Sequence, residues 1–206
     1  MSAPDPRRTR RQRSALIGLA LLFLAPLALA FYLYYGIGWR PSGRVNHGDL
    51  VDPALPLPDV ALPRADADAG DAMTRADFLR HKWTLLYFGA GECSKRCRGD
   101  LYDTRQVRAA LGADRERVQR VFLAQGACCD LVWLRAEHPD LLAVRATPAA
   151  APLLERLRQA DAGRPAADRV YVIDPLGNLM MSYAPDAQPK GMLEDLKRLL
   201  KLSQVG

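Results

Sequence analysis

Two cysteines, Cys93 and Cys97, directly follow an apolar run, residues 83–89, that has the composition of a buried strand. A short loop containing glycine follows the run, and we expect a helix to begin near Cys97 and to continue to Leu111. Thiols at the start of a helix lie near unpaired backbone N–H groups and the positive end of the helix dipole, which favours the thiolate. Thiolates in this position either exchange disulfides or hold a soft metal ion.

Basic side chains beside this pair strengthen the prediction of reactive thiols. Lys95, Arg96 and Arg98 flank Cys97, and nearby positive charge lowers the pKa of a thiol. Glu92 acts in the opposite direction. The alternative interpretation is a solvated charged loop whose effect on the thiols is screened.

The other two cysteines, Cys128 and Cys129, follow a second predicted strand, residues 117–124. The carboxyl ends of parallel strands meet at one edge of a sheet, so this loop should approach the Cys93 loop. Either thiol could then resolve a disulfide formed at Cys93 or Cys97, or add a ligand to a site for a soft metal. Two alternatives remain. The adjacent cysteines could be small buried apolar residues, or the four could form structural disulfides. Bridges within each pair close tiny loops and stabilise little, but a structural pairing of the Cys93–Cys129 type stays open.

The net charge of +6 comes mostly from an arginine cluster within residues 1–13, so we do not expect nucleic-acid binding. Residues 14–38 carry no charge and are long enough to cross a bilayer as a helix. Aromatic residues gather at the far end of this stretch, as at membrane interfaces: Tyr32, Tyr34, Tyr35 and Trp39. The alternative is a signal peptide cleaved after the small residues 28–30.

These features predict four segments in a chain of 206 residues. They are a basic cytoplasmic tail at 1–13, a transmembrane helix at 14–38, a proline-rich tether at 39–63 and a globular domain at 64–206. The positive-inside rule keeps the arginine cluster in the cytoplasm, so this single-pass chain should have everything after Trp39 in the compartment outside the membrane. Thiols in that compartment oxidise unless they are kept reduced or bind a metal.

The remaining pattern predicts the elements of the globular domain. Beyond the strands at 83–89 and 117–124 we expect a helix at 148–159, a hairpin of strands at 169–174 and 179–183, and a closing amphipathic helix at 190–202. This order predicts a three-layer α/β domain with a central mixed sheet.

Several motifs over residues 45–206 together resemble a known family. They are Asn46-His47-Gly48, the strand run at 82–89, Cys93-Ser-Lys-Arg-Cys97, the strand at 117–123 and the Asp-Pro-Leu-Gly hairpin within 171–181. The chain resembles the thioredoxin-like superfamily and, within it, the membrane-anchored Sco/SenC proteins of cytochrome oxidase assembly. This resemblance implies a thioredoxin-like fold that binds copper or reduces thiols while the copper centre of the oxidase is built. It also implies a location in the inner membrane with the carboxyl-terminal domain in the periplasm, and cytochrome c oxidase subunits or copper chaperones as partners.

The chain departs from the Sco pattern at the third copper ligand. Sco proteins use the two motif cysteines and a histidine, and the hairpin places that histidine near Ala166, with no histidine after His138. Prolines that usually follow the motif cysteines are replaced by Ser94 and Arg98. His138 is the one histidine that we would test as a substitute ligand.

We therefore predict a thiol-disulfide oxidoreductase whose catalytic residues are Cys93 and Cys97 and which assists oxidase copper-site assembly. The first alternative is a Cu(I) metallochaperone without catalytic turnover, with Cys93 and Cys97 as ligands and Cys128 and Cys129 as further sulfur donors. The second alternative is an assembly scaffold whose cysteines no longer act. The missing histidine favours the oxidoreductase over the metallochaperone.

Overall fold

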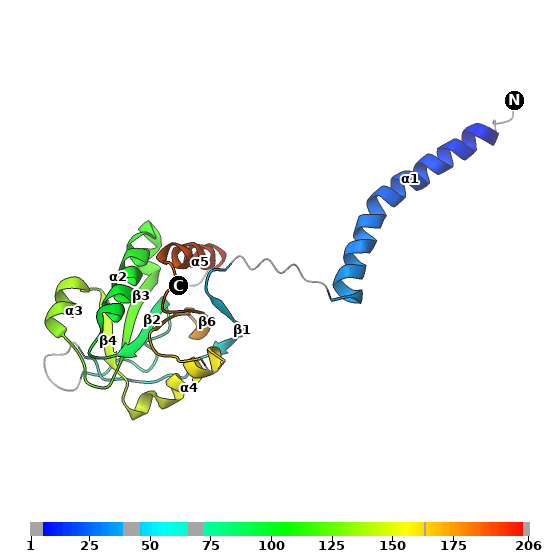
Figure 1. Ribbon diagram of the computed structural model, residues 1–206. Helices are drawn as coiled ribbons and strands as arrows, with labels where there is room; N and C mark the ends of the chain where they lie inside the picture. The colour runs from blue at the N-terminus through cyan, green and yellow to red at the C-terminus, as the bar shows by residue number, and fades with distance from the viewer. Residues whose placement is uncertain (1–5, 39–45, 66–71, 163, 204–206) are drawn as a thin grey trace. The chain divides into compact units, whose positions relative to one another are not determined.

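The computed structural model describes residues 6–38, 46–65, 72–162 and 164–203 (Figure 1). The chain divides into two compact units, Met1–Arg44 and Val45–Gly206. In the first unit, helix α1 (Pro6–Phe31) continues into a short π-helix, η1 (Tyr32–Gly36). The helix thus begins within the segment that we predict as a basic tail.

The apolar part of this first unit has the properties of a membrane anchor. Leu16–Gly36 has a mean hydropathy of 2.5, is long enough to cross a bilayer, and contains no buried residue. A helix that is apolar on all sides is stable when lipid covers it. Trp39, which we place in the aromatic belt, lies outside the described residues.

The second unit is built on a six-stranded sheet in the order β1-β6-β5-β2-β3-β4. Its strands are β1 (Asp49–Pro56), β2 (Trp83–Ala90), β3 (Val118–Gln125), β4 (Leu141–Arg145), β5 (Arg169–Ile173) and β6 (Asn178–Tyr183). Strands β2, β3 and β4 are parallel, whereas β5 pairs antiparallel with both β2 and β6, and β1 pairs antiparallel with β6. The sheet is therefore mixed, as the sequence predicts.

Helices cover both faces of this sheet (Figure 1). They are α2 (Lys95–Ala109), α3 (Leu131–Glu137), α4 (Ala151–Ala160) and α5 (Pro189–Leu202), with short 3₁₀ segments η2 (Gly112–Arg117) and η3 (Pro148–Ala150). Alternate residues of β2 serve opposite faces. Leu85 and Tyr87 pack in the cluster that α2, α3 and α5 complete, and Leu86 packs in the cluster that α4 completes. The three-layer α/β arrangement is confirmed.

The structure differs from the predicted tether at 39–63. Its middle contains β1, and Leu57 and Leu62, which follow β1, are buried in the core. The prolines of this stretch predict an extended linker, but proline is also compatible with an edge strand, where one row of N–H groups needs no partner. Accordingly, β1 pairs with β6 at its two ends and has an irregularity between Leu50 and Leu55. Strand β4 and helix α3 are also present without having been predicted.

Candidate functional site

The first cysteine pair lies at the junction of β2 and α2, where the sequence places it. Every residue of β2 is buried except the last, Ala90, and the Cys93 N–H donates to the Ala90 carbonyl at 3.1 Å. Cys93 adopts a left-handed backbone with φ of 45°, a conformation that costs roughly 1–2 kcal/mol for a residue with a Cβ. Cys93 and Cys97 are joined by a disulfide, with their Cα atoms 5.1 Å apart.

Helix α2 begins immediately around this bridge. Ser94 is its N-cap, and the Ser94 Oγ accepts a hydrogen bond from the Cys97 N–H at 3.3 Å. The first turn contains no acidic residue, so no carboxylate in that turn opposes the stabilisation of a thiolate by the helix dipole. Ser94, one of the departures from the Sco pattern, therefore acts as the helix cap.

The two motif cysteines are nevertheless deeply buried. Cys93 is 5% exposed and Cys97 is 1% exposed. Both belong to the core cluster on the α2 face of the sheet. A large partner therefore has little direct access to either sulfur in this arrangement.

The second cysteine pair lies beside the first, in the loop that follows β3. The Gly91 N–H donates to the Gln125 carbonyl at 2.8 Å. A Cβ on Gly91 would lie 2.8 Å from the Ala127 carbonyl carbon and 2.9 Å from the Cys128 Cα. Cys128 and Cys129 form a second disulfide, are partly buried, and pack against the cluster that holds Cys93 and Cys97.

Arg98 fastens this second loop to the start of α2. Its Nη2 donates to the Asp130 Oδ2 at 3.2 Å, and its guanidinium carbon lies 4.4 Å from the centre of the Trp133 ring. Arg96 forms an ion pair with Asp186. Carboxylates therefore offset these two arginines, and the positive field around the thiols is weaker than the sequence alone suggests.

An acidic cluster on the same side of the site was not predicted. The Tyr87 hydroxyl donates to the Asp168 Oδ1 at 2.9 Å, and burial together with this carboxylate raises the Tyr87 pKa far above its usual range. Asp168 has a left-handed backbone with φ of 60°, and its N–H donates to the Phe88 carbonyl at 2.8 Å. Two strained residues, Cys93 and Asp168, thus flank the end of β2, a pattern common at functional sites.

Asp100 adds a second carboxylate to this acidic cluster. It follows Cys97 by three residues on α2, so the two share one helix face. Its Oδ2 is buried with no hydrogen-bond partner among the described residues. Burial raises its pKa to about 6, and Arg96 acts against that rise. The i, i+3 spacing from Cys97 was visible in the sequence, but the burial of the carboxylate was not.

The structure does not supply a third copper ligand of the Sco type. Ala166 occupies the position where that histidine is expected, and its carbonyl accepts from the Tyr171 hydroxyl at 2.9 Å. Among the described residues, no group of three or more His, Cys, Asp or Glu side chains is placed to hold a metal ion. The dithiol alone, once reduced, offers two soft sulfurs, a donor set that suits Cu(I).

His138, the candidate substitute, is engaged elsewhere. Its ring is buried, with Nδ1 3.4 Å from the Arg120 Nη2 and the ring centre 4.9 Å from that of Trp133. Burial and the Arg120 charge lower the His138 pKa to about 4. These contacts give His138 a packing role between α3 and the core.

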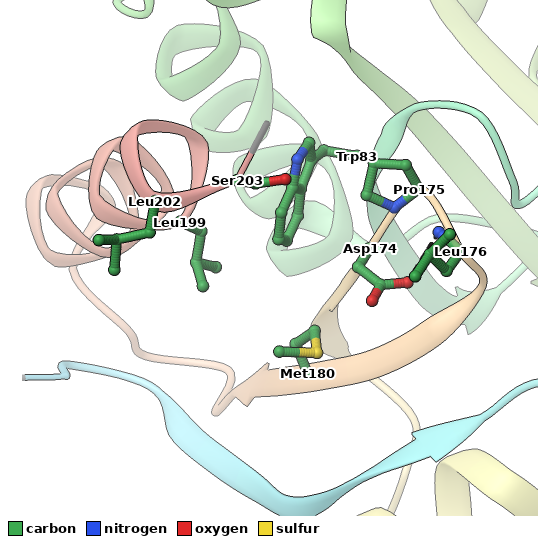
Figure 2. Close-up of a pocket in the computed structure, with 8 residues that line it drawn as sticks. All are labelled: Trp83, Asp174, Pro175, Leu176, Met180, Leu199, Leu202 and Ser203. Carbon is green, nitrogen blue, oxygen red and sulfur yellow. Dashed lines mark hydrogen bonds between the residues drawn. The ribbon is translucent and has the colours of Figure 1, made fainter. Parts of the chain in front are cut away.

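A shallow hollow of about 250 Å³ lies at the other end of β2. Figure 2 shows Trp83, Pro175 and Leu199 around it, with Trp83 at the start of the strand. The cysteine loop follows the end of the same strand, and seven residue steps along β2 span roughly 23 Å. The hollow is therefore separate from the dithiol.

Comparisons with known proteins agree with this architecture. A family model described as a transmembrane-like, thioredoxin-like, C-terminal domain matches residues 83–203. Apo Sco1 from Thermus thermophilus has a TM-score of 0.55 at 19% identity, over 77% of this chain and 99% of that chain. Copper-bound yeast Sco1 has a TM-score of 0.56 at 16% identity, over 73% of this chain and 95% of that chain.

A third similar structure is a thiol:disulfide interchange protein of the thioredoxin family from Chlorobium tepidum. It has a TM-score of 0.54 at 18% identity, over 71% of this chain and 97% of that chain. No curated protein sequence matches the chain. At these identities the solved structures establish the fold and leave the activity to be argued from the site.

Proposed function

The chain belongs to the family of transmembrane-like, thioredoxin-like C-terminal domains, whose model matches more than half of it, and from this premise we propose that it is a membrane-anchored thiol-disulfide exchange protein. The observation that carries the proposal is the Cys93–Cys97 bridge at the start of α2. A bridge over so short a spacing contributes little by restricting the unfolded chain. Its position at a helix N-terminus instead suits reversible exchange.

The exchange chemistry needs only the two thiols and a client disulfide. In the reduced protein one thiolate attacks a client sulfur, forms a mixed disulfide and releases one client thiolate. The second thiol of the pair, once deprotonated, attacks the protein sulfur of the mixed disulfide. The Cys93–Cys97 bridge forms, and the second client thiolate leaves. Two electrons pass from the protein to the client, which takes up two protons.

We place this exchange in the periplasm, on the outer side of the inner membrane, with assembly of the oxidase copper site as its context. The arginine cluster before Leu16–Gly36 supports this orientation. The likeness of the fold to Sco1 structures supports the context. Client disulfides on cytochrome c oxidase subunits or copper chaperones would be the natural substrates.

Cu(I) delivery is the second candidate function, favoured by the likeness to copper-bound yeast Sco1. Copper would here be cargo, held by the Cys93 and Cys97 sulfurs in the reduced protein. Because Ala166 stands where a histidine is expected, the site lacks the nitrogen donor that Cu(II) prefers, and we expect only Cu(I) to bind.

The two functions are distinguished by experiments on the reduced full-length chain in detergent. A disulfide-bonded peptide serves as the model client, and release of its thiols is followed over time. Thiol-disulfide exchange at the first pair predicts that the wild type reduces more peptide per protein than a Cys93→Ser/Cys97→Ser variant, which keeps only Cys128 and Cys129. Equal reduction by both proteins would refute the proposal.

Anaerobic Cu(I) competition on the same two proteins tests the second function. Binding that disappears in the Cys93→Ser/Cys97→Ser variant supports copper delivery at this site. Cu(I) affinity that is unchanged in the variant eliminates the pair as a copper site. His138→Ala serves as the matched control and should leave Cu(I) affinity unaltered, because its ring packs against Arg120 and Trp133.

A further inference from the structure

The two disulfides differ in how accessible they are to thiols in solution. Cys93 and Cys97 are almost completely buried, at 5% and 1% exposure. Cys128 and Cys129 retain partial exposure, in a loop whose neighbouring residues 125–127 and 130 are exposed. A partner would therefore reach the second pair first.

The second pair is held against the first from two directions. On one side Gly91, two residues before Cys93, lies so close to Ala127 and Cys128 that only glycine fits there. On the other side Arg98, the residue after Cys97, binds Asp130 at 3.2 Å and covers the Trp133 ring. The loop of Cys128 and Cys129 is thus fastened to the loop of the first pair and to the first turn of α2.

A structural role accounts poorly for a bridge between adjacent residues. Such a bridge closes the smallest possible loop, so it removes almost no freedom from the unfolded chain. Its partial exposure and its place beside another disulfide instead suit exchange, which requires access and an attacking thiolate.

We propose that Cys128 and Cys129 form a second redox pair that relays electrons between thiols in solution and the buried Cys93–Cys97 bridge. This inference rests on the proposed exchange function of Cys93 and Cys97. External thiols react at the partly exposed pair, and that pair then reduces the buried pair.

The relay balances at each step. Two glutathione thiolates reduce the Cys128–Cys129 bridge and leave as one glutathione disulfide, and two protons complete the new thiols. One of these thiols, deprotonated, then attacks the Cys93–Cys97 bridge and forms a mixed disulfide between the loops. The remaining thiol of the second pair attacks its own neighbour, the Cys128–Cys129 bridge forms again, and Cys93 and Cys97 leave as thiols. Two electrons and two protons have moved from one pair to the other.

The first test measures how fast reduced glutathione opens the Cys93–Cys97 bridge in the full-length chain in detergent. After acid quenching, the thiols are alkylated and the tryptic peptides are analysed by mass spectrometry. Trypsin cuts after Lys95, so Cys93 and Cys97 fall in different peptides once their bridge is open, and the state of each pair is measured separately. In a Cys128→Ser/Cys129→Ser variant the bridge should open about tenfold more slowly or worse, because the surviving pair is buried.

The outcomes separate this inference from the function on which it rests. An equal rate in the variant and the wild type would overturn the relay while leaving thiol exchange at Cys93 and Cys97 intact. A bridge that glutathione opens in neither protein would overturn both. Matching circular dichroism spectra and melting curves establish that the variant is folded.

The second test traps the intermediate and does not depend on that variant. Four double variants each keep one cysteine of each pair, for example Cys97→Ser/Cys129→Ser, which keeps Cys93 and Cys128. After treatment with oxidised glutathione, at least one of the four should contain an intramolecular bridge between the loops, seen as a cross-linked tryptic peptide. Absence of the bridge in all four would overturn the relay.

A glycine pair supplies the matched control for the contact itself. Gly91→Ala should reduce bridging between the loops severalfold in the trapping variant, because its Cβ would collide with the Ala127 backbone. Gly99→Ala should leave bridging unchanged, since nothing lies within 4 Å of the added Cβ. Equal bridging in both variants would show that the loop contact does not govern exchange.

Discussion

Two carboxylates of the same domain, Asp161 and Asp100, differ in how completely their oxygens are hydrogen-bonded. Asp161 is fully buried, and both of its oxygens are occupied. Oδ1 accepts from the Ser182 hydroxyl at 3.0 Å and pairs with the Arg169 Nε at 3.0 Å, and Oδ2 accepts from the Tyr171 hydroxyl. Asp100, near the dithiol, has a buried Oδ2 with no partner among the described residues.

Asp161 thus belongs to the scaffold of the domain, whereas Asp100 lies at the candidate site. A buried carboxylate with complete partners fixes the geometry around β5 and β6. A buried carboxylate that lacks a partner costs stability, and proteins retain such costs mainly where they act. The cysteine edge therefore holds the less satisfied of the two carboxylates.

Breaking the satisfied cluster should give the largest effect. Asp161→Ala leaves the buried Arg169 charge with only the partly exposed Asp49 as an ionic partner, so we expect a loss of roughly 3–5 kcal/mol in the free energy of unfolding, measured by urea denaturation. Asp59→Ala is the control, because its ion pair with Arg80 is exposed and should contribute less than about 1 kcal/mol. Similar losses in both variants would show that the buried contacts of Asp161 contribute no more to stability than an exposed ion pair does.

His138, a buried histidine in a third region of the domain, should make stability depend on pH, because burial and a neighbouring arginine disfavour its charged form. The His138 pKa is lowered to about 4 by burial, Arg120 and Arg105, against Asp140 and Glu137. Between about pH 6.5 and pH 4 the unfolded chain therefore binds a proton that the folded chain does not. Stability should fall by up to about 3 kcal/mol as the pH drops through this window.

Urea denaturation of the wild type and of His138→Gln from pH 7 to pH 4 measures this contribution. The pH dependence of the variant should be shallower by the amount that His138 contributes, since glutamine does not titrate. Parallel curves would show that His138 is not held neutral by its surroundings.

Replacing Asp100 should raise the stability of the domain, whereas replacing Asp161 should lower it. Its pKa is raised to about 6 by burial, so the folded chain holds a proton more firmly than the unfolded chain does. The stabilising contribution of the neutral form is present at low pH and is lost as the pH rises through 6. Asp100→Asn, which stays neutral, should therefore be more stable than the wild type at pH 7.5 by on the order of 1–2 kcal/mol.

That advantage should disappear near pH 4, where the wild-type carboxyl is protonated. Thermal melting of both proteins at the two pH values provides the measurement. A variant that is less stable than the wild type at pH 7.5 would show that the carboxylate has partners after all.

The helix cap at the dithiol should give the smallest effect. Ser94→Ala removes the oxygen that accepts from the Cys97 N–H, so we expect a loss of about 1 kcal/mol in unfolding free energy. Thr147→Ala is the matched control, because Thr147 precedes η3 without a side-chain capping bond. Equal changes in both variants would indicate that the Ser94 bond contributes nothing.

Much of the cysteine edge could be predicted from the sequence because local patterns encode it. The apolar run of β2, the start of α2 and the closing helix α5 all follow from periodicity and spacing. The meeting of the two cysteine loops follows from the parallel pairing of β2 and β3. The prolines of β1 concealed an edge strand whose pairing with β6 is fixed only by residues far along the chain.

Other features of the site could not be predicted because they depend on tertiary contacts. The pairing of Arg98 with Asp130 joins residues on different elements, and it reduces the positive charge around the thiols. The contact of Tyr87 with Asp168 joins residues that are 81 positions apart in the sequence. Burial of the Asp100 carboxylate likewise depends on the packing of α2.

The central claim, that Cys93 and Cys97 form a reversible redox pair, is tested most directly by equilibrium with glutathione. Full-length protein, started either oxidised or reduced, is incubated in a series of glutathione redox buffers and then alkylated and weighed by mass spectrometry. We predict that both starting forms converge on one two-electron transition of this pair, and that the transition persists in Cys128→Ser/Cys129→Ser after longer incubation. A bridge that stays oxidised in every buffer would behave as a structural disulfide and would contradict the account.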